Sequence, residues 1–311
     1  MYLSSTEGIR SPQTGMSYRD EPTRRRIATV GDSFTFGLES SYDETWQVHL
    51  GRSLGTDVSV LNFGVDGHGI DQAYLRYRRD VRPRNPEITI LGFIDHDIVR
   101  AMSVYTFLTF PAWGMPFSKP RFDLRGDRLA LLNVPVISPE RMLEAREVAD
   151  LPLLEHERGF NREEWEPRAV HASYLLRYIV SRFPRWPAQP EMQWTERALA
   201  LNRALILAFA RDAASAGTLP LVVYFPTRGD FEGLDRSATV ELLAAASAAG
   251  IRHLDLTSCI GEIGPQRAFR DAHQHYSAEG NAAVARCLAP PVRDLLARGG
   301  PREGPGQRSR R

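Results

Sequence analysis

Short apolar runs alternate with amphipathic segments toward both ends of the chain. Runs of strand length lie at residues 27–30, 58–63, 88–93, 219–225 and 251–256. Helical spacing of apolar residues predicts helices at residues 44–54, 72–79, 196–216, 238–249 and 278–296. Strands that alternate with helices in this way predict a parallel sheet covered on both faces. The expected fold class is therefore α/β.

The middle of the chain, residues 106–190, interrupts this alternation. It is rich in prolines and aromatic residues, with a hairpin expected around Gly126-Asp127 and helical segments near residues 140–148 and 169–182. We interpret it as an insertion in a single domain of residues 1–297. Its aromatic residues either line a sugar or acyl pocket or pack into a small core. Residues 298–311 are rich in Gly, Pro and Arg, and we expect a disordered tail there.

Charge and composition exclude several classes of protein. The 39 Lys and Arg residues nearly balance 38 Asp and Glu, for a net charge of +1, which favours neither a nucleic-acid partner nor a membrane surface. The chain shows no signal peptide and no membrane span, so a cytoplasmic location is expected. If an N-terminal portion is missing from the sequence, the protein would instead be membrane-associated or exported. Two cysteines, Cys259 and Cys287, are too few for a disulfide framework, and we expect buried free thiols.

A serine follows the first predicted strand, in the stretch Gly31-Asp32-Ser33-Phe34-Thr35-Phe36-Gly37. Backbone N–H groups at the start of a helix carry partial positive charge and can hold an oxyanion. Ser33 is therefore a candidate nucleophile, although serine is also a common helix N-cap. Asp32 is expected to brace the turn through backbone hydrogen bonds rather than to act as a catalytic acid.

Three candidate residues come directly after predicted strands. Ser33, Gly67 and His96 follow the first, second and third strands, and the carboxyl ends of parallel strands meet at one edge of a sheet. We therefore expect these residues to gather there. The chain contains neither Gly-x-Gly-x-x-Gly nor the Gly-Lys-Ser/Thr of a phosphate loop, which argues against nucleotide binding.

Four motifs, in this order along the chain, resemble those of the SGNH/GDSL hydrolase family. They are Gly31-Asp32-Ser33, Asn62-Phe63-Gly64-Val65-Asp66-Gly67, Gly92-Phe93-Ile94-Asp95-His96-Asp97 and His275-Tyr276-Ser277-Ala278-Glu279-Gly280-Asn281. The resemblance implies a three-layer α/β/α fold with a doubly wound, flavodoxin-like parallel sheet. It also implies Ser33 as nucleophile, His275 as general base, and an oxyanion hole that includes the Gly67 N–H. Asn62, Asp32 and Asp97 would support these groups.

The chain departs from the family pattern at two places. His96 stands where the family has an asparagine donor to the oxyanion; an imidazole N–H can donate in the same way, but it also titrates near neutral pH. Either the oxyanion hole is pH-sensitive, or it relies on Ser33 and Gly67 alone. The family acid usually precedes the histidine by three residues, where this chain has Ala272. Either a bulge brings Asp271 onto the His275 ring, or a backbone carbonyl orients the ring and the site works as a dyad.

The activity implied by the resemblance is ester hydrolysis through an acyl-enzyme on Ser33. The substrate would be a small-molecule or glycan ester, such as an acetylated sugar or a lipid ester, and the reaction would need no metal or organic cofactor. A metal site formed by Asp95, His96, Asp97, His273 and His275 is a weaker alternative, because their spacing does not require one. Two further alternatives are acyl transfer to a sugar hydroxyl and non-catalytic binding of a glycan or acyl ligand.

Overall fold

The computed structural model describes residues 2–19, 25–109, 117–160, 162, 166, 172–182, 196–270 and 275–299. The chain forms two compact units, one of residues 1–101 and 199–311 and the other of residues 102–198. The segment expected to be an insertion falls within the second unit.

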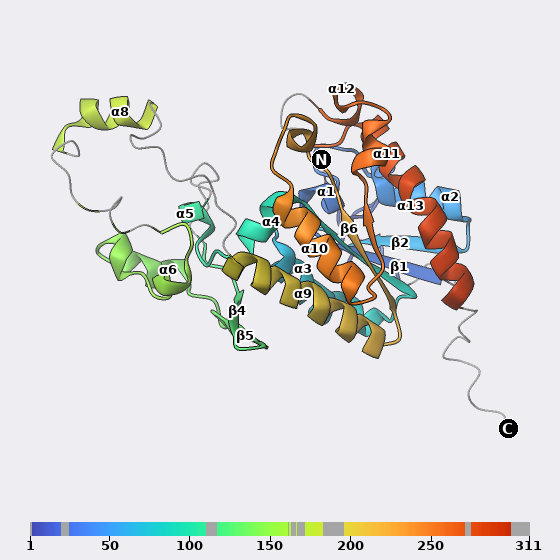
Figure 1. The fold of residues 1–311 in the computed structure, drawn as a ribbon, viewed down its shortest axis with the longest axis horizontal. Helices are drawn as coiled ribbons and strands as arrows, with labels where there is room; N and C mark the ends of the chain where they lie inside the picture. Colours follow the sequence, from blue (N-terminus) through green and yellow to red (C-terminus); the bar gives the residue numbers. More distant parts are fainter. Residues whose placement is uncertain are drawn as a thin grey trace. The chain divides into compact units, whose positions relative to one another are not determined.

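A parallel five-stranded sheet forms the centre of the first unit (Figure 1). Its strands, in spatial order, are β2 (Val58–Asn62), β1 (Arg25–Val30), β3 (Ile88–Phe93), β6 (Leu219–Tyr224) and β7 (His253–Asp255). Each neighbouring pair runs parallel, and Ile27, for example, pairs with Val60 on one side and Ile88 on the other. This order reverses direction between β1 and β3, as in flavodoxin-like sheets, and ligands of such folds bind at that point.

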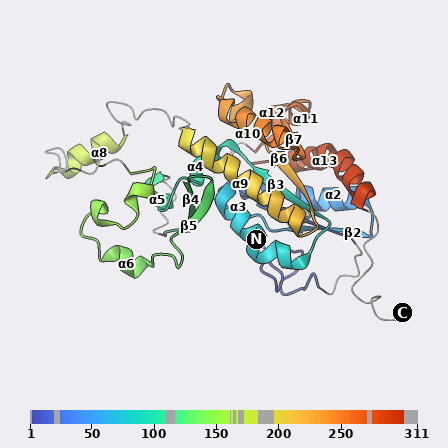
Figure 2. The same cartoon turned by 60° about the horizontal axis from the view of Figure 1, so that its bottom comes forward.

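Helices cover both faces of this sheet (Figures 1 and 2). One face carries α2 (Trp46–Leu54) and α13 (Ala278–Gly299), and the other carries α3 (Ile70–Arg76), α9 (Glu196–Ser215) and α10 (Ser237–Ala248). The unit therefore has three layers, α/β/α, and the expected fold class is confirmed. Three shorter helices follow the ends of strands, namely α1 (Ser33–Phe36), α4 (Asp95–Arg100) and α11 (Thr257–Gly261), and a further short helix, α12 (Pro265–Ala268), follows α11.

The core of the first unit forms where each helix turns its apolar side toward the sheet. On one face, Trp46 and Leu50 of α2 join Leu288 and Val292 of α13 against the strands, all fully buried. On the other face, the ring of Phe209 in α9 meets that of Tyr77 at 5.1 Å between centroids. Burying residues of this size on both faces supplies most of the driving force for this fold.

The predicted elements agree with the observed ones apart from their boundaries. β1 begins two residues earlier than expected, and β7 is shorter at both ends. Beyond α3, the chain continues as a π-helical turn over Tyr77–Val81. The last helix extends to Gly299, so Arg298 is helical rather than part of the expected tail. Residues 300–311 lie outside the described residues.

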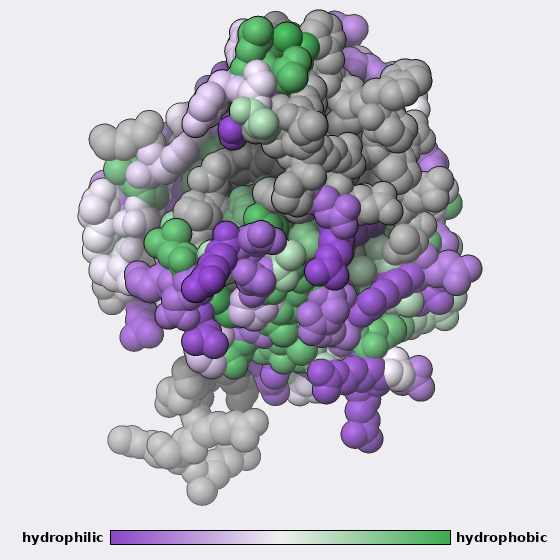
Figure 3. All heavy atoms as spheres, turned by 90° about the vertical axis from the view of Figure 1, so that its left-hand side faces the viewer, coloured by the Kyte–Doolittle hydropathy of each residue, from purple (hydrophilic) through white to green (hydrophobic). Residues whose placement is uncertain are grey.

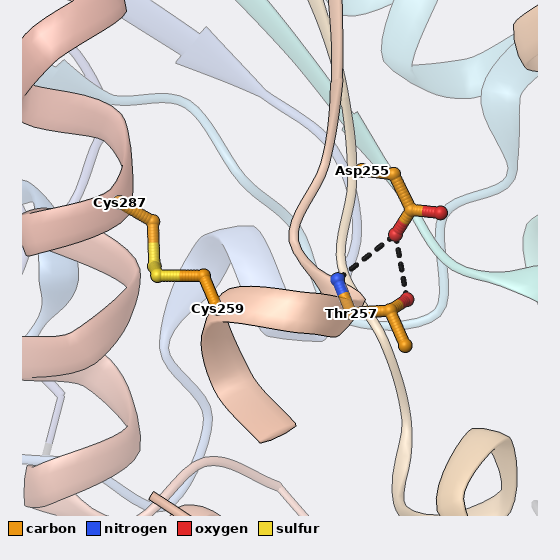
Figure 4. Close-up of a disulfide and its surroundings, with 4 residues drawn as sticks. All are labelled: Asp255, Thr257, Cys259 and Cys287. Atoms are coloured by element: carbon orange, nitrogen blue, oxygen red, sulfur yellow. Dashed lines mark hydrogen bonds between the residues drawn. A yellow bond between two sulfur atoms is a disulfide. The ribbon is translucent and has the colours of Figure 1, made fainter. Parts of the chain in front are cut away.

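The prediction of two free thiols is wrong, because Cys259 and Cys287 form a disulfide between α11 and α13 (Figure 4). The Asp255 Oδ1 atom accepts hydrogen bonds from the Thr257 N–H at 2.9 Å and the Thr257 hydroxyl at 2.6 Å, at the start of α11. α11 therefore begins two residues after the end of β7, and its Cys259 bonds to Cys287 of α13. A count of cysteines could not reveal this, because the two residues are 28 positions apart and meet only in the fold.

The second unit contains an antiparallel hairpin of β4 (Arg121–Arg125) and β5 (Arg128–Leu132), which confirms the turn expected at Gly126-Asp127. Within the described residues, the unit also contains the helices α5 (Thr106–Thr109), α6 (Pro139–Leu143) and α8 (Tyr174–Arg182). The buried carboxylate of Glu157 accepts from the N–H groups of Val104 and Tyr105 at 2.5 and 2.6 Å, and from Gly159 at 2.7 Å. One side chain therefore ties together loops that contain little regular structure.

Hydrophobic residues reach the surface of the molecule among hydrophilic ones (Figure 3). Several of the exposed ones belong to α8, where Tyr174, Leu175 and Tyr178 are each more than half exposed. Within the described parts of the chain, no helix combines the length and apolar character needed to cross a membrane.

Candidate active site

Ser33 and His275 meet at the carboxyl edge of the sheet, although 242 positions separate them. The Nε2 atom of His275 lies 3.0 Å from the Oγ atom of Ser33, within hydrogen-bonding distance. Ser33 is the first residue of α1, directly after β1, and His275 comes just before α13. Both side chains are largely buried, with the His275 side chain 14% exposed.

The sharp turn that presents Ser33 depends on Asp32 and on nearby glycines. Asp32, and not Ser33, is the N-cap of α1, because its Oδ1 accepts from the N–H groups of Phe34 at 3.0 Å and Thr35 at 3.5 Å. A Cβ atom on Gly31 would lie 2.7 Å from the Gly92 carbonyl oxygen. Only glycine, which has no side chain, therefore fits at position 31. The turn that it permits places the Ser33 hydroxyl at the edge of the sheet.

The loop after β2 is fastened to this turn. The Val65 N–H donates to the Gly31 carbonyl at 3.0 Å, and Asn62 accepts from the Gly64 N–H at 2.9 Å while donating to the Phe36 carbonyl at 3.1 Å. A Cβ atom on Gly64 would lie 2.4 Å from the Phe36 nitrogen, so only glycine permits this approach. Gly67, the predicted oxyanion donor, follows in the same loop with a positive φ of 73°.

A buried cluster of charges lies beneath the nucleophile. Arg100 donates to Asp97 at 2.7 Å and reaches Asp32 at 3.5 Å, and all three side chains are almost fully buried. Asp97 also accepts from the Ile94 N–H at 3.1 Å and so caps α4. Arg100, which the sequence analysis did not single out, thus joins the turn after β1 to the turn after β3.

Burial governs the ionisation of this cluster. It raises the pKa of Asp32, against the attraction of Arg100 and the hydrogen bonds from Phe34 and Thr35. Burial and the Asp32 carboxylate together raise the pKa of Asp97 well above its usual value. Burial would lower the pKa of Arg100, but attraction to Asp97 and Asp32 outweighs it and raises that pKa.

His96 lies at the start of α4, with its side chain 49% exposed and its Nε2 atom 3.6 Å from the Asp95 Oδ2 atom. Asp95 itself is buried, which raises the pKa of its carboxyl against the attraction of His96. His96 therefore belongs to the same edge of the sheet as Ser33, in the turn after the neighbouring strand.

The loop that carries His275 is held on both sides of the histidine. The Arg270 N–H donates to the His275 carbonyl at 2.8 Å, and the Ser277 N–H donates to the Ala268 carbonyl at 2.9 Å. The buried Tyr276 hydroxyl donates to the Pro226 carbonyl at 2.9 Å. Asp271, the acid expected to orient the ring, and His273 lie outside the described residues.

A carboxylate that the sequence analysis did not identify lies on the other side of the imidazole. The Glu39 Oε2 atom is 3.5 Å from the Nδ1 atom of His275. Glu39 lies six positions after Ser33, in the loop that follows α1, and its backbone has a positive φ of 65°. No motif marks it, since its only signal is an acidic residue close in sequence to the candidate nucleophile.

No protein-family model matches the chain, and no curated protein sequence matches it either. Among solved structures, it is similar to a putative lipolytic protein of the G-D-S-L family from Desulfitobacterium hafniense DCB-2, at 13% identity and a TM-score of 0.46 over 85% of this chain and 97% of that one. A lipase/acylhydrolase from Enterococcus faecalis gives 13% identity and a TM-score of 0.46 over 90% and 100% of the two chains.

An acetylxylan esterase from Geobacillus stearothermophilus is also similar, at 10% identity and a TM-score of 0.47 over 88% of this chain and 94% of that one. Similarities of this size concern the fold alone.

Proposed function

We propose that this chain is an ester hydrolase that uses Ser33 as its nucleophile and His275 as its general base. The observation that carries the proposal is the 3.0 Å separation of Ser33 Oγ and His275 Nε2. A serine hydroxyl is a weak nucleophile, and a base within hydrogen-bonding distance activates it. Because the two residues come from opposite ends of the chain, sequence proximity does not account for their contact.

The reaction begins when Ser33 Oγ attacks the ester carbonyl carbon and its proton passes to His275 Nε2. The carbonyl electrons move onto oxygen, and the proposed donors to this oxyanion are the N–H groups of Ser33 and Gly67 and the ring N–H of His96. When the tetrahedral intermediate collapses, the carbon–oxygen bond to the alcohol breaks. His275 returns its proton to the departing alcohol, and an acyl group remains on Ser33.

Water then completes the cycle. His275 accepts a proton from water as the water oxygen attacks the acyl carbon, and collapse of the second intermediate releases the carboxylic acid and restores the Ser33 hydroxyl. The sum is one ester and one water converted to one acid and one alcohol. The substrates that we propose are short acyl esters of sugars or lipids, the class that the resemblance of the four motifs implies.

Hydrolysis of a short-chain chromogenic ester tests this proposal. We expect Ser33→Ala and His275→Ala each to lower kcat by roughly 10⁴-fold or more, because the two residues act as a unit. Ser258→Ala provides the matched control: it removes an exposed serine hydroxyl from α11 and should leave the rate unchanged.

Three outcomes would favour other functions. Full activity in Ser33→Ala would place the chemistry elsewhere. Product formed only when an acceptor sugar is added would indicate acyl transfer. Absence of turnover with any ester, together with an unreacted Ser33 after exposure to an organophosphonate, would indicate a binding protein.

A further inference from the structure

We infer that Glu39 is the carboxylate that orients His275, an inference that rests on the proposed function of the same site. Its Oε2 atom lies 3.5 Å from His275 Nδ1, on the opposite side of the ring from the Nε2 atom that faces Ser33. The two side chains are 21% and 14% exposed, so solvent screens their attraction only in part. Ser33, His275 and Glu39 thus stand in line as nucleophile, base and acid.

The backbone of Glu39 adopts a conformation that a residue with a side chain seldom takes. Its φ of 65° lies in the left-handed region, which mainly glycine occupies. The Glu39 N–H donates to the Tyr2 hydroxyl at 2.7 Å. A strained backbone persists where its surroundings hold it, and such residues concentrate at functional sites.

Arg10 holds the chain on both sides of Glu39. Its Nη1 atom donates to the carbonyls of Phe36 at 2.8 Å and Gly37 at 2.6 Å, and its Nη2 atom donates to the Ser40 carbonyl. The Arg10 side chain is itself buried, and its guanidinium lies 4.8 Å from the ring centroids of both Tyr2 and Phe36. One cation therefore fixes three carbonyls of the loop that presents Glu39.

The same loop is tied to the helix that follows His275. The Asn281 side chain in α13 donates to the Ser40 hydroxyl at 3.1 Å and accepts from the Trp46 N–H at 3.2 Å. Asn281 lies six positions after His275, and Ser40 lies next to Glu39. Hydrogen bonds between α13 and the Glu39 loop therefore hold the segments that carry Glu39 and His275 against each other.

A carboxylate at this position has a defined chemical role. It favours the ring form with a proton on Nδ1, which leaves the lone pair of Nε2 free to accept the Ser33 proton. Once His275 is doubly protonated, the negative charge of Glu39 stabilises the cation. Asp32 also attracts a charged His275, but its oxygens already accept from the N–H groups of Phe34 and Thr35 and contact Arg100 and the Ser33 hydroxyl.

The test compares four variants in the full-length chain. Glu39→Gln keeps the size and shape of the side chain and removes its charge. We expect kcat to fall by roughly 10²- to 10⁴-fold, with KM within about twofold of the wild-type value. Glu39→Asp keeps the charge and should recover at least about tenfold of this loss. Glu262→Gln, the same change at an exposed glutamate at the end of α11, is the matched control and should leave kcat unchanged. Asp271→Asn should also leave it unchanged.

A second readout separates orientation from a structural role. In ¹⁵N NMR spectra of the His275 ring, the wild-type protein should carry its proton on Nδ1, and Glu39→Gln should shift the population toward the Nε2 form. The thermal midpoints of the two proteins should agree. If Asp271→Asn lowers kcat while Glu39→Gln leaves both kcat and the ring spectrum unaltered, the inference is wrong.

Failure of the proposed function would look different. In that case the wild-type protein would neither hydrolyse esters nor react with an organophosphonate at Ser33. The ¹⁵N spectrum of the His275 ring would still test the role of Glu39. If the proton lies on Nδ1 in the wild-type protein and leaves it in Glu39→Gln, Glu39 orients the ring even in a protein without esterase activity.

Discussion

At the scale of single residues, the candidate site combines groups of two kinds. His275 contacts Ser33 through Nε2 and Glu39 through Nδ1, so a proton can pass between Ser33 and His275 while Glu39 stabilises the charged ring. Asp32, Arg100 and Asp97 form a buried cluster whose oxygens and guanidinium fix the turns after β1 and β3. The first group carries the proposed chemistry, and the second holds the backbone that presents it.

His96 offers a residue-scale prediction about the oxyanion hole. If its ring N–H donates to the oxyanion, His96→Ala should lower kcat on a chromogenic ester by about 10²-fold, as loss of one such donor does in other enzymes. His96→Asn supplies an amide donor at the same position and should retain activity within about tenfold of wild type. An unchanged kcat in His96→Ala would remove the side chain from the mechanism.

Asp97 gives a prediction about pH. Burial and the Asp32 carboxylate raise the pKa of Asp97 in the folded state. In the unfolded state the pKa of an aspartate is about 4. At pH values between these two pKa values, Asp97 is protonated in the folded protein and ionised in the unfolded protein. Raising the pH through this window therefore disfavours the folded state. The asparagine side chain in Asp97→Asn does not titrate. We therefore expect the free energy of unfolding of the wild-type protein to fall relative to that of the variant as the pH rises from 4 to 7.

Denaturant unfolding of both proteins at several pH values in this range measures the difference. Titrating groups far from Asp97 are shared by the two proteins and largely cancel, whereas any change at Asp32, whose pKa burial also raises, is part of the measured difference. If the stability of the wild-type protein instead rises relative to that of the variant as pH increases, the contact with Arg100 outweighs burial and lowers the pKa of Asp97.

At the scale of elements, the sequence predicted the fold better than the site. Apolar runs and their spacing sufficed for the five strands and the main helices, because burial on a parallel sheet depends on those patterns. Ser33 and His275 were identifiable because each stands in a motif. Glu39 and Arg10 were not, since their roles arise from a loop conformation and from carbonyl contacts that no residue pattern encodes.

The disulfide provides a prediction at this scale. It closes a loop of 28 positions between α11 and α13, and cross-linking a loop of that length stabilises a fold by about 3–4 kcal/mol in the chain-entropy account. Reduction, or the double variant Cys259→Ser and Cys287→Ser, should lower the free energy of unfolding by about that amount. Denaturant unfolding in the presence and absence of reductant measures it.

A thiol titration of the denatured protein without reductant supplies the control. It should detect no free thiol. If both cysteines react, the thiols are free, as expected from the sequence, and the predicted loss of stability on reduction should vanish.

At the scale of the whole molecule, the doubly wound sheet brings distant parts of the chain to one edge. The turns after β1, β2 and β3 and the segment before α13 all end there, at the point where the strand order reverses. This topology explains why motifs spread from Gly31 to Asn281 can act as one site.

The most direct test of the account is to trap the acyl-enzyme. When the protein is mixed rapidly with excess p-nitrophenyl acetate and quenched in acid, intact-mass measurement should show one added acetyl group, and peptide mapping should place it on Ser33. Ser33→Ala should show none. Hydrolysis by the wild-type protein with the acetyl group on another residue, or with full activity retained in Ser33→Ala, would contradict the account.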